Sequence, residues 1–242
     1  MSDYQKIGVN SNTDDNSFRK IVPALLRKGL DKVDLSMFDE KSKIDLLNAA
    51  GDEYLRKGDL VNAMKAFMFT NNKQGLIQVG DAFKEVSLYS NSVDAYHLAQ
   101  NYDKLVSIGD FCLKEGCVAE SFKAYQILED EDRLTRLGDY CLEKERIDFA
   151  IEVYGKLKND VQRKYRLIKI GEKCTKDNQL TLAAKAYELA NDIEKLNKVG
   201  DLFLKAGLLK DALNVYERAD NQIMVQFIKD NFPEAEFKGE YL

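Results

Sequence analysis

The sequence predicts an all-α fold built from repeated pairs of helices, and three observations carry this prediction. The two prolines are Pro23 and Pro233, and the stretch between them is rich in the residues that favour helices. Glycines recur within this stretch with a period of 29, which widens once to 33. Around each glycine, apolar residues fall at i, i+3, i+4 and i+7, the period of an amphipathic helix rather than of a strand.

Six helix pairs follow from these glycines, each of which lies in the first helix of a pair. The glycines are Gly51, Gly80, Gly109, Gly138, Gly171 and Gly200. A leucine stands four residues before each glycine, an apolar residue directly before it and an acidic residue directly after it. These acidic residues, which we call the acid column, are Asp52, Asp81, Asp110, Asp139, Glu172 and Asp201. A glycine inside a helix costs about 1 kcal/mol relative to alanine, so six of them at one register indicate close packing.

The second helix of each pair carries a small residue and, four residues later, an aromatic one. The small residues are Ala63, Ser92, Ser121, Ala150, Ala183 and Ala212, and the aromatic residues are Phe67, Tyr96, Tyr125, Tyr154, Tyr187 and Tyr216. We expect each first helix to approach the small residue at its glycine, while the aromatic ring fills the space between neighbouring pairs. The turn between the two helices contains Gly58, Ser87, Gly116, Glu145, Asn178 or Gly207. Because some of these are neither Gly nor Asn, which tolerate a left-handed φ, we expect this turn to differ among the pairs.

The N-terminal end repeats part of the pattern. Leu26 to Gly29 matches the segment one period later, and Phe38 precedes Phe67 by one period. This predicts a degenerate first pair, whose first helix begins or kinks at Pro23, beside Val22.

The C-terminal end closes the array. Residues 222–231 predict a lone capping helix, because a stack of repeats must cover its last apolar face. We therefore expect one helical-repeat domain over residues 17–231, with flexible tails at residues 1–16 and 232–242.

The wider spacing between Gly138 and Gly171 adds four residues, about one helical turn, so an apolar face can extend without losing phase. We call residues 156–169 the basic joint. Its cations are Lys156, Lys158, Arg163, Lys164, Arg166 and Lys169, and Tyr165 lies among them. Two interpretations stay open, a solvated helix face and a local contact for an acidic segment of a partner.

The charge balance and the apolar segments limit the location and the partners. The chain has 36 Lys and Arg against 41 Asp and Glu, a formal net charge of −5, which excludes a generally basic nucleic-acid coat. The start of the sequence has no apolar signal region, and the longest early apolar run, residues 21–26, is far too short to span a bilayer. We expect a soluble, cytoplasmic protein with no membrane insertion.

Residues that could carry catalysis are scarce. The single histidine, His97, falls outside the apolar pattern, so we expect it to be exposed. Cys112, Cys141 and Cys174 stand in a column otherwise held by aromatic residues, which predicts core positions, whereas Cys117 lies at a turn and is expected to be partly exposed. No CxxC pair, phosphate-binding loop, zinc-protease motif or nucleophile elbow occurs. The sequence therefore predicts no enzyme, no metal site and no cofactor.

The unit Leu-x-x-x-Gly-Asp-x-Phe/Tyr/Cys-x-x-x-Gly, followed by Ala-x-x-x-Tyr-x-x-Ala, resembles the tetratricopeptide repeat over residues 44–219. Tetratricopeptide units run to about 34 residues, and the units here are shorter by five. Such short units also resemble the α-solenoids of vesicle-coat and intraflagellar-transport subunits. The resemblance implies a right-handed α-solenoid of antiparallel helix pairs, with six regular units, a degenerate N-terminal unit and a C-terminal capping helix.

In the tetratricopeptide family the first helices line a concave groove, and the residue after the glycine faces it. By resemblance the acid column lines this groove, together with the residues three before each glycine, which are Asn48, Ile77, Val106, Thr135, Ile168 and Asn197. An acidic and partly apolar groove favours a basic, amphipathic peptide or helix. The family's carboxylate-binding groove uses basic side chains there, so the sequence argues against that specificity.

Two alternatives concern the acidic residues. The acid column also fits simple pairing with nearby cations, which are Lys104, Arg133, Arg166 and Lys195. A second set of acids, Asp45, Asp103, Asp132 and Glu194, stands six residues before the glycines, where we expect each first helix to begin.

Three functions follow in order of support. The leading hypothesis is a non-catalytic scaffold that binds a partner protein or peptide through the concave face. The alternatives are a structural subunit of a larger coat-like or transport assembly and an RNA-binding helical-repeat protein, which the basic joint favours and the net acidity opposes. The sequence leaves the partner, the pathway and the oligomeric state open.

Overall fold

The structure is a computed structural model of the chain, and it describes residues 22–23, 35–36 and 38–232. These residues form α-helices and turns, with no β-strand among them. The helices are α2 (Glu40–Arg56), α3 (Leu60–Phe69), α4 (Lys73–Glu85), α5 (Tyr89–Leu98), α6 (Tyr102–Lys114), α7 (Val118–Leu128), α8 (Glu131–Glu143), α9 (Ile147–Gly155), α10 (Asp160–Lys176), α11 (Leu180–Leu189), α12 (Ile193–Lys205), α13 (Leu209–Arg218) and α14 (Gln222–Asn231). The chain divides into two compact parts, Met1–Leu128 and Glu129–Leu242. In each part successive helix pairs pack in order, so the predicted all-α solenoid fold is confirmed.

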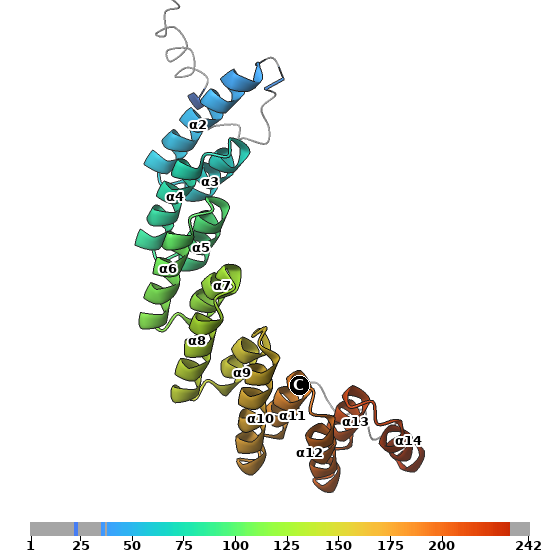
Figure 1. The fold of residues 1–242 in the computed structure, drawn as a ribbon. Coiled ribbons are helices and arrows are strands. Elements are labelled where there is room, and N and C mark those ends of the chain that lie inside the picture. The colour runs from blue at the N-terminus through green and yellow to red at the C-terminus, as the bar shows by residue number, and fades with distance from the viewer. Residues whose placement is uncertain (1–21, 24–34, 37, 233–242) are drawn as a thin grey trace, which may run out of the picture. The chain divides into compact units, whose positions relative to one another are not determined.

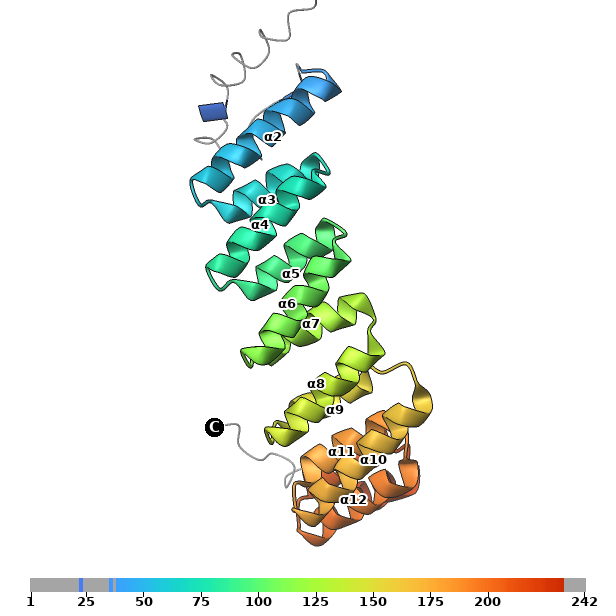
Figure 2. The same ribbon diagram turned by 60° about the vertical axis from the view of Figure 1, so that its left-hand side comes forward.

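Within each part the helices form two layers. In the first part α2, α4 and α6 lie along one side and α3, α5 and α7 along the other (Figure 1). From α2 to α6 each helix packs on the next one in the chain, and α2 also contacts α4 while α5 contacts α7. The same alternation of first and second helices holds in the second part, where α8, α10 and α12 are the first helices (Figure 2). We call the surface of the first helices in each part its first-helix face.

Each first helix begins at an Asp or Asn cap. These caps are Asp39, Asn72, Asn101, Asp130, Asn159 and Asp192, and Asn221 caps α14 in the same way. Each cap side chain accepts a hydrogen bond from the backbone N–H three residues later, which satisfies one free donor of the helix start. Asp103, Asp132 and Glu194 lie in first turns, as predicted. The prediction for Asp45 is wrong, because α2 begins at Glu40, about one turn earlier relative to its glycine than α6 does.

The turn inside each pair has the same backbone conformation in all six pairs. The residues Gly58, Ser87, Gly116, Glu145, Asn178 and Gly207 all have positive φ. The N–H of the following residue donates to the carbonyl five residues earlier, as Leu88 N does to Phe83 O at 2.9 Å. This is the Schellman pattern, which satisfies carbonyls that a helix end leaves free. The expectation that the turns differ is wrong, because these hydrogen bonds hold Ser87 (φ 60°) and Glu145 (φ 57°) in the left-handed region despite its cost.

Each first-helix glycine lies against the aromatic ring of its own pair. A Cβ at Gly80 would come 2.5 Å from Cε1 of Tyr96, and one at Gly200 would come 2.7 Å from Cε1 of Tyr216. The predicted close approach is therefore confirmed, but the aromatic ring rather than the small residue requires the glycine. The small residue lies beside the same backbone, since Oγ of Ser92 donates to the Gly80 carbonyl at 2.8 Å.

The cysteines occupy the positions predicted for them. Cys112, Cys141 and Cys174 are buried and Cys117 is partly exposed. Burial raises the pKa of Cys112 to about 12, and burial also raises the pKa of Cys141 and of Cys174. A buried thiol that holds its proton is a poor nucleophile, so these side chains act as core residues.

Helix α10 takes up the four additional residues of the fifth repeat. Its cap, Asn159, follows the cap of α8, Asp130, by the ordinary period of the repeat, but Gly171 lies one helical turn further from its cap than Gly138 does. The additional turn therefore lies at the start of α10, which has 17 residues against 13 in α8 and in α12. Leu157, in the short segment between α9 and α10, is buried.

The ends of the array are described in part. Helix α14 covers the predicted residues, packs on α13 and buries Val225 and Ile228. Phe38 lies in a bend directly before Asp39 and packs against the core of the first pair. The remainder of the expected N-terminal pair and both expected tails lie outside the described residues, and the single domain over residues 17–231 stays a prediction. No helix in the described part of the chain has both the length and the apolar character that crossing a bilayer requires.

Candidate functional site

The acid column lies on the first helices, with carboxylates that are partly open to solvent. Asp52, Asp81 and Asp110 follow one another in the first part, and Asp139, Glu172 and Asp201 do so in the second. The exposed fraction of the side chain is 43% for Asp81 and 47% for Asp139. These carboxylates are thus accessible to a partner and also close enough to the core to bond within the fold.

Four acids of the column accept a hydrogen bond from the tyrosine of their own pair. The phenol of Tyr96 donates to Oδ1 of Asp81 at 2.6 Å. The equivalent bonds are Tyr125 to Asp110 at 2.7 Å, Tyr154 to Asp139 at 2.6 Å and Tyr216 to Asp201 at 2.6 Å. Burial of the ring, and then this bond to a carboxylate, raise the pKa of Tyr96, which keeps the phenol protonated as a donor.

A cation from the next first helix completes this arrangement. Nζ of Lys104 lies 2.7 Å from Oδ1 of Asp81 and 5.8 Å from the ring centre of Tyr96, within cation–π range. We call such a set an acid–tyrosine–cation triad. The equivalent set in the second part is Asp139, Tyr154 and Arg166, with 2.5 Å between acid and cation. Lys195 also lies 3.0 Å from Glu172 and within cation–π range of Tyr187, but the phenol of Tyr187 lies 3.5 Å from Oγ1 of Thr175, so this set is not a triad. Because the cation belongs to the following repeat, the triad joins two successive repeats.

Both donors of a triad contact the same carboxylate oxygen. Tyr96 and Lys104 both bond to Oδ1 of Asp81, and Tyr154 and Arg166 both bond to Oδ1 of Asp139. Burial raises the pKa of Asp81, but the hydrogen bonds from Lys104 and Tyr96 outweigh burial and leave that pKa lowered. The acids therefore pair inside the fold, as one interpretation of the sequence allowed, while Oδ2 is left to the solvent.

Asp52 differs from the other acids of the column. The aromatic residue of its pair is Phe67, which has no hydroxyl, and Gly75 stands at the register position that Lys104 holds one repeat later. Among the described residues none bonds to this carboxylate, and partial burial raises its pKa. Among the described residues, Asp52 is therefore the acid of the column whose carboxylate has the fewest hydrogen-bond partners.

The residues three before each glycine are half-buried. This holds for Asn48, Ile77, Val106, Thr135, Ile168 and Asn197. Oδ1 of Asn48 accepts from Oγ1 of Thr70 at 2.8 Å and from Nδ2 of Asn72 at 2.9 Å, and Oδ1 of Asn197 accepts from Nδ2 of Asn221 at 2.6 Å. Asn48 and Asn197 thus bond to the cap residue of the helix that follows their repeat, and the role of the six residues in partner binding stays a prediction.

The basic joint is partly neutralised. Lys158 pairs with Glu129, Arg163 with Asp160, and Arg166 with Asp139. By contrast, Lys156, Lys164 and Lys169 form no ion pair with any described residue. The remaining positive charge of the joint is therefore concentrated on these three lysines.

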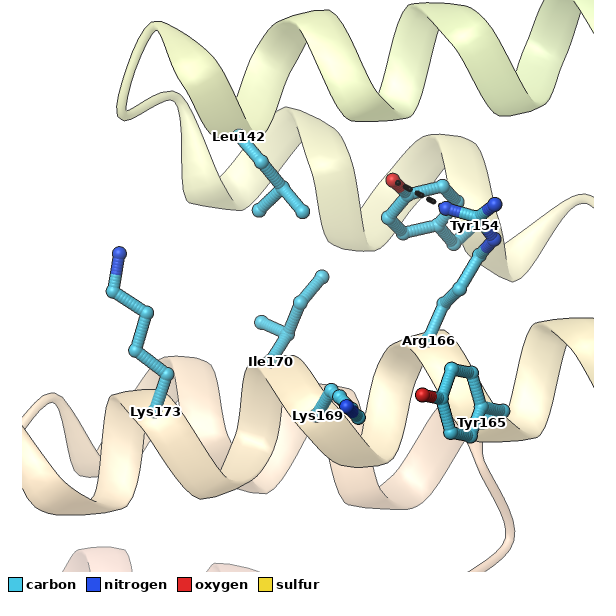
Figure 3. Close-up of a pocket in the computed structure, with 7 residues that line it drawn as sticks. All are labelled: Leu142, Tyr154, Tyr165, Arg166, Lys169, Ile170 and Lys173. Atoms are coloured by element: carbon cyan, nitrogen blue, oxygen red, sulfur yellow. Dashed lines mark hydrogen bonds between the residues drawn. The ribbon is translucent and has the colours of Figure 1, made fainter.

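A pocket of about 370 Å³ lies between α8, α9 and α10 in the second part. It is lined by Leu142 of α8, Tyr154 of α9, and Tyr165, Arg166, Lys169, Ile170 and Lys173 of α10. Figure 3 shows Leu142 and Tyr154 on one side and the α10 side chains on the other, with Arg166 reaching the phenol of Tyr154. Ile170 is buried and Leu142 half-buried, whereas Lys169 and Lys173 are exposed. The pocket thus combines an apolar interior with a basic rim.

The groups that the sequence offered for catalysis are not brought together. His97 is exposed on α5, and the buried cysteines hold their protons. Within the described residues, no three His, Cys, Asp or Glu side chains are grouped so as to hold a metal ion.

The tyrosines as partners of the acid column, and the pocket, were not predicted from the sequence. The spacing between Asp81 and Tyr96, and that between Asp81 and Lys104, recur along the chain and were available as a signal. The sequence indicates the pocket only weakly. Six residues before its glycine, α10 has Tyr165, whereas α12 has Glu194 at the same register.

Comparisons with known proteins add little to this geometry. No protein-family model matches the chain, and no curated protein matches it. Among solved structures the chain is similar to one described as "Crystal structure of MamA protein", at 15% identity, over 84% of this chain and 99% of that chain, with a TM-score of 0.24.

Proposed function

We propose that the protein is a non-catalytic scaffold that binds another protein through the first-helix face of each part. The observation that supports this most is the regular presentation of equivalent side chains on stacked first helices. The residue two before each glycine, for example, is exposed in five successive repeats, as Gln78, Ser107, Arg136, Lys169 and Lys198. Repetition of this kind suits the recognition of an extended partner surface or peptide.

The state of the reactive groups agrees with a binding role. The thiol of Cys112 is buried with a raised pKa, and the carboxylates of Asp81 and Asp139 are used to bond tyrosines and cations. These groups stabilise the stack of repeats, so their chemistry is explained without a reaction.

The acid column supports a basic, amphipathic partner through the oxygens that the triads leave free. Oδ1 of Asp81 receives both internal donors, whereas Oδ2 has no donor among the described residues. The positive charge of Lys104 nevertheless reduces the local negative potential. We therefore assign the acid column two roles, joining the repeats and orienting a basic segment that lies along the face.

Site-specific photocrosslinking tests the proposal. A photoreactive phenylalanine analogue is placed at Gln78 or Ser107 on the first helices and, as matched controls, at His97 or Lys185, which are exposed on second helices. The full-length variants are irradiated in the native lysate, and the crosslinked proteins are identified by mass spectrometry. We expect the same partner to be crosslinked from Gln78 and Ser107 and not from the two control positions.

Crosslinks that form only from His97 and Lys185 would show that the second helices bind the partner and would overturn the proposal. Equal crosslinking from all four positions would indicate unspecific contact and would also contradict it. The substitutions lie at exposed positions, so circular dichroism is expected to show unchanged helix content.

A further inference from the structure

We propose that the pocket between α8, α9 and α10 binds an acidic segment of a partner protein that inserts one apolar side chain. This inference rests on the scaffold function proposed above and names the partner's chemistry at one place on the first-helix face. The pocket of about 370 Å³ lies at the low end of the size range of small-ligand pockets, which suits a single large side chain with its neighbours.

The interior of the pocket favours an apolar group. Leu142 and Ile170 face each other across it, and the rings of Tyr154 and Tyr165 close the end where Arg166 lies (Figure 3). The phenol of Tyr154 is engaged with Asp139, so it offers no free donor to a polar ligand. A leucine or phenylalanine side chain would bury its surface against these four groups.

The rim of the pocket selects negative charge. Arg166 pairs with Asp139, but Lys169 and Lys173 have no acidic partner within the described chain. The nearby carboxylate of Glu172 bonds to Lys195 of the next first helix. Two exposed lysines that flank an apolar pocket attract carboxylates on either side of the inserted side chain.

Arg166 adds a second feature that points to an anionic ligand. Its Nη1 bonds to Asp139 and Tyr154, while its Nε is buried and has no acceptor among the described residues. Buried donors are rarely left without an acceptor. A small rotation of the Arg166 side chain on binding would let a carboxylate of the bound segment supply one with a charge-assisted hydrogen bond.

The same place in the next repeat shows what makes this pocket different. There a pocket of about 150 Å³ is lined by Thr175, Tyr187, Lys195, Lys198, Val199 and Leu202. Its two lysines are neutralised, since Lys198 pairs with Glu194 and Lys195 with Glu172. On α10 the position of Glu194 is taken by Tyr165, so Lys169 lies over a ring, 4.9 Å from its centre, and keeps its charge.

Peptide binding by the full chain tests the proposal. Three probe peptides are used: fluorescent EEFEE, fluorescent EEAEE, which lacks the apolar side chain, and unlabelled KKFKK, which reverses the charge. Fluorescence anisotropy is expected to show binding of EEFEE and at least 10-fold weaker binding of EEAEE. Unlabelled KKFKK, which the acid column can bind, is expected not to displace EEFEE from the pocket. Higher salt should weaken the binding of EEFEE, because the lysines are solvent-exposed.

Two variants at exposed positions change the rim: one neutralises Lys169 and also removes the ring of Tyr165, and the other removes the charge of Lys173. Tyr165→Glu copies the arrangement of Glu194 and Lys198 and neutralises Lys169, while Lys173→Leu copies Leu202. Each variant is expected to lower the affinity for EEFEE at least 10-fold. The control is Lys185→Glu at an exposed second-helix position, which makes the net charge more negative than either variant does and is expected to alter binding less than 2-fold.

A probe with a photoreactive analogue in place of its phenylalanine locates the bound peptide. Crosslinks to proteolytic fragments of the protein that contain Leu142 or Ile170 support the proposal. Absence of EEFEE binding, equal affinity for EEFEE and EEAEE, displacement of EEFEE by KKFKK, or crosslinks outside α8–α10 would each overturn it. In those cases a cellular partner crosslinked from Gln78 and Ser107 would still support the scaffold function. The two proposals can therefore be refuted separately.

Discussion

Tyr96 and Asp81 are joined by a hydrogen bond of 2.6 Å although they lie on different helices of their pair. The bond satisfies the hydroxyl of Tyr96, whose ring is buried. The same carboxylate oxygen of Asp81 also accepts a hydrogen bond from Lys104 of the next repeat. One acid thus couples the inside of a repeat to its stacking on the following repeat. The same bond recurs at Asp110, Asp139 and Asp201, so four of the six acids after the glycines join the two helices of their pair.

The first prediction concerns this bond. Tyr96→Phe removes the hydroxyl but keeps the ring, so we expect the free energy of unfolding to fall by about 1 kcal/mol, as for a lost hydrogen bond to a partly exposed charged group. Urea unfolding measures the change, and a double-mutant cycle with Asp81→Asn isolates the coupling between the two side chains.

The control for this prediction is Tyr102→Phe, because Tyr102 is 59% exposed. Its effect should stay within about 0.5 kcal/mol, as for most surface substitutions. Additive effects of Tyr96→Phe and Asp81→Asn would show that the bond does not contribute to stability.

The second prediction concerns the pH dependence of two acids at the same register. The pKa of Asp81 is lowered in the fold, so its stabilising contribution is present above the unfolded value of 3.8 and is lost as the pH falls through the lowered pKa. The pKa of Asp52 is raised by burial, so its ionised form opposes folding, and stability recovers as the pH falls through that raised pKa. At neutral pH we therefore expect Asp52→Asn to stabilise the protein and Asp81→Asn to destabilise it.

Carboxyl carbon chemical shifts followed by NMR against pH measure the two pKa values directly. The titration of Asp52 should occur at higher pH than that of Asp81. The reverse order, or destabilisation by Asp52→Asn at neutral pH, would contradict the assignment of Asp52 as an acid without a partner among the described residues.

The third prediction concerns the glycine under each aromatic ring. Alanine at Gly200 places a Cβ 2.7 Å from Cε1 of Tyr216, and overpacking of this kind costs about 1 to 3 kcal/mol. Helix propensity alone would favour alanine by about 1 kcal/mol. We expect Gly200→Ala to be destabilising overall, because the ring is fully buried and has no room to move.

The sign of this effect should reverse when the ring is removed. In a Tyr216→Leu background, Gly200→Ala is expected to stabilise the protein, because only helix propensity remains. Thermal and urea unfolding of the four proteins give the comparison, and equal effects of Gly200→Ala in both backgrounds would show that the ring is not the reason for the glycine.

The fourth prediction concerns the left-handed turn residues. Glu145 has φ 57°, a conformation that costs a non-glycine residue about 1 to 2 kcal/mol, whereas glycine adopts it freely. Glu145→Gly is expected to raise the free energy of unfolding by only about 0.5 to 1 kcal/mol, because glycine also gains entropy in the unfolded chain. In contrast, Glu152→Gly, at an exposed position inside α9, should lower it by about 1 kcal/mol. Destabilisation by both substitutions would show that the turn does not strain Glu145.

The sequence was sufficient for the parts of the fold that depend on periodicity. Regular glycines and apolar residues predicted the helix pairs and the bounds of α14, because each repeat imposes the same packing requirement on the same positions. The turn at Glu145 was predicted wrongly, since the hydrogen bonds that close a Schellman turn use backbone groups and can hold an unfavourable residue. Local preference was outweighed there by tertiary structure.

The candidate site was less accessible to sequence reasoning. The cations Lys104, Arg166 and Lys195 were recognised as neighbours of the acids, but their contact with the tyrosine rings depends on how side chains are oriented between repeats. The pocket at α10 depends on Lys173 and Tyr165, which are unremarkable as residue types and stand out only against Leu202 and Glu194 at the same register of α12. A repeat-by-repeat comparison of exposed positions, rather than a search for motifs, reveals such a place.

The additional turn at the start of α10 shows how an array of this kind can change in length. An insertion of four residues is close to one full turn of helix, so the cap at Asn159 and the core positions after it both keep their neighbours. An insertion of two residues would instead rotate the apolar stripe to the opposite side of the helix and expose it. Growth of a first helix is therefore permitted in steps of a whole turn, and each such step adds a short length of new surface on which recognition can evolve while the rest of the repeat is preserved.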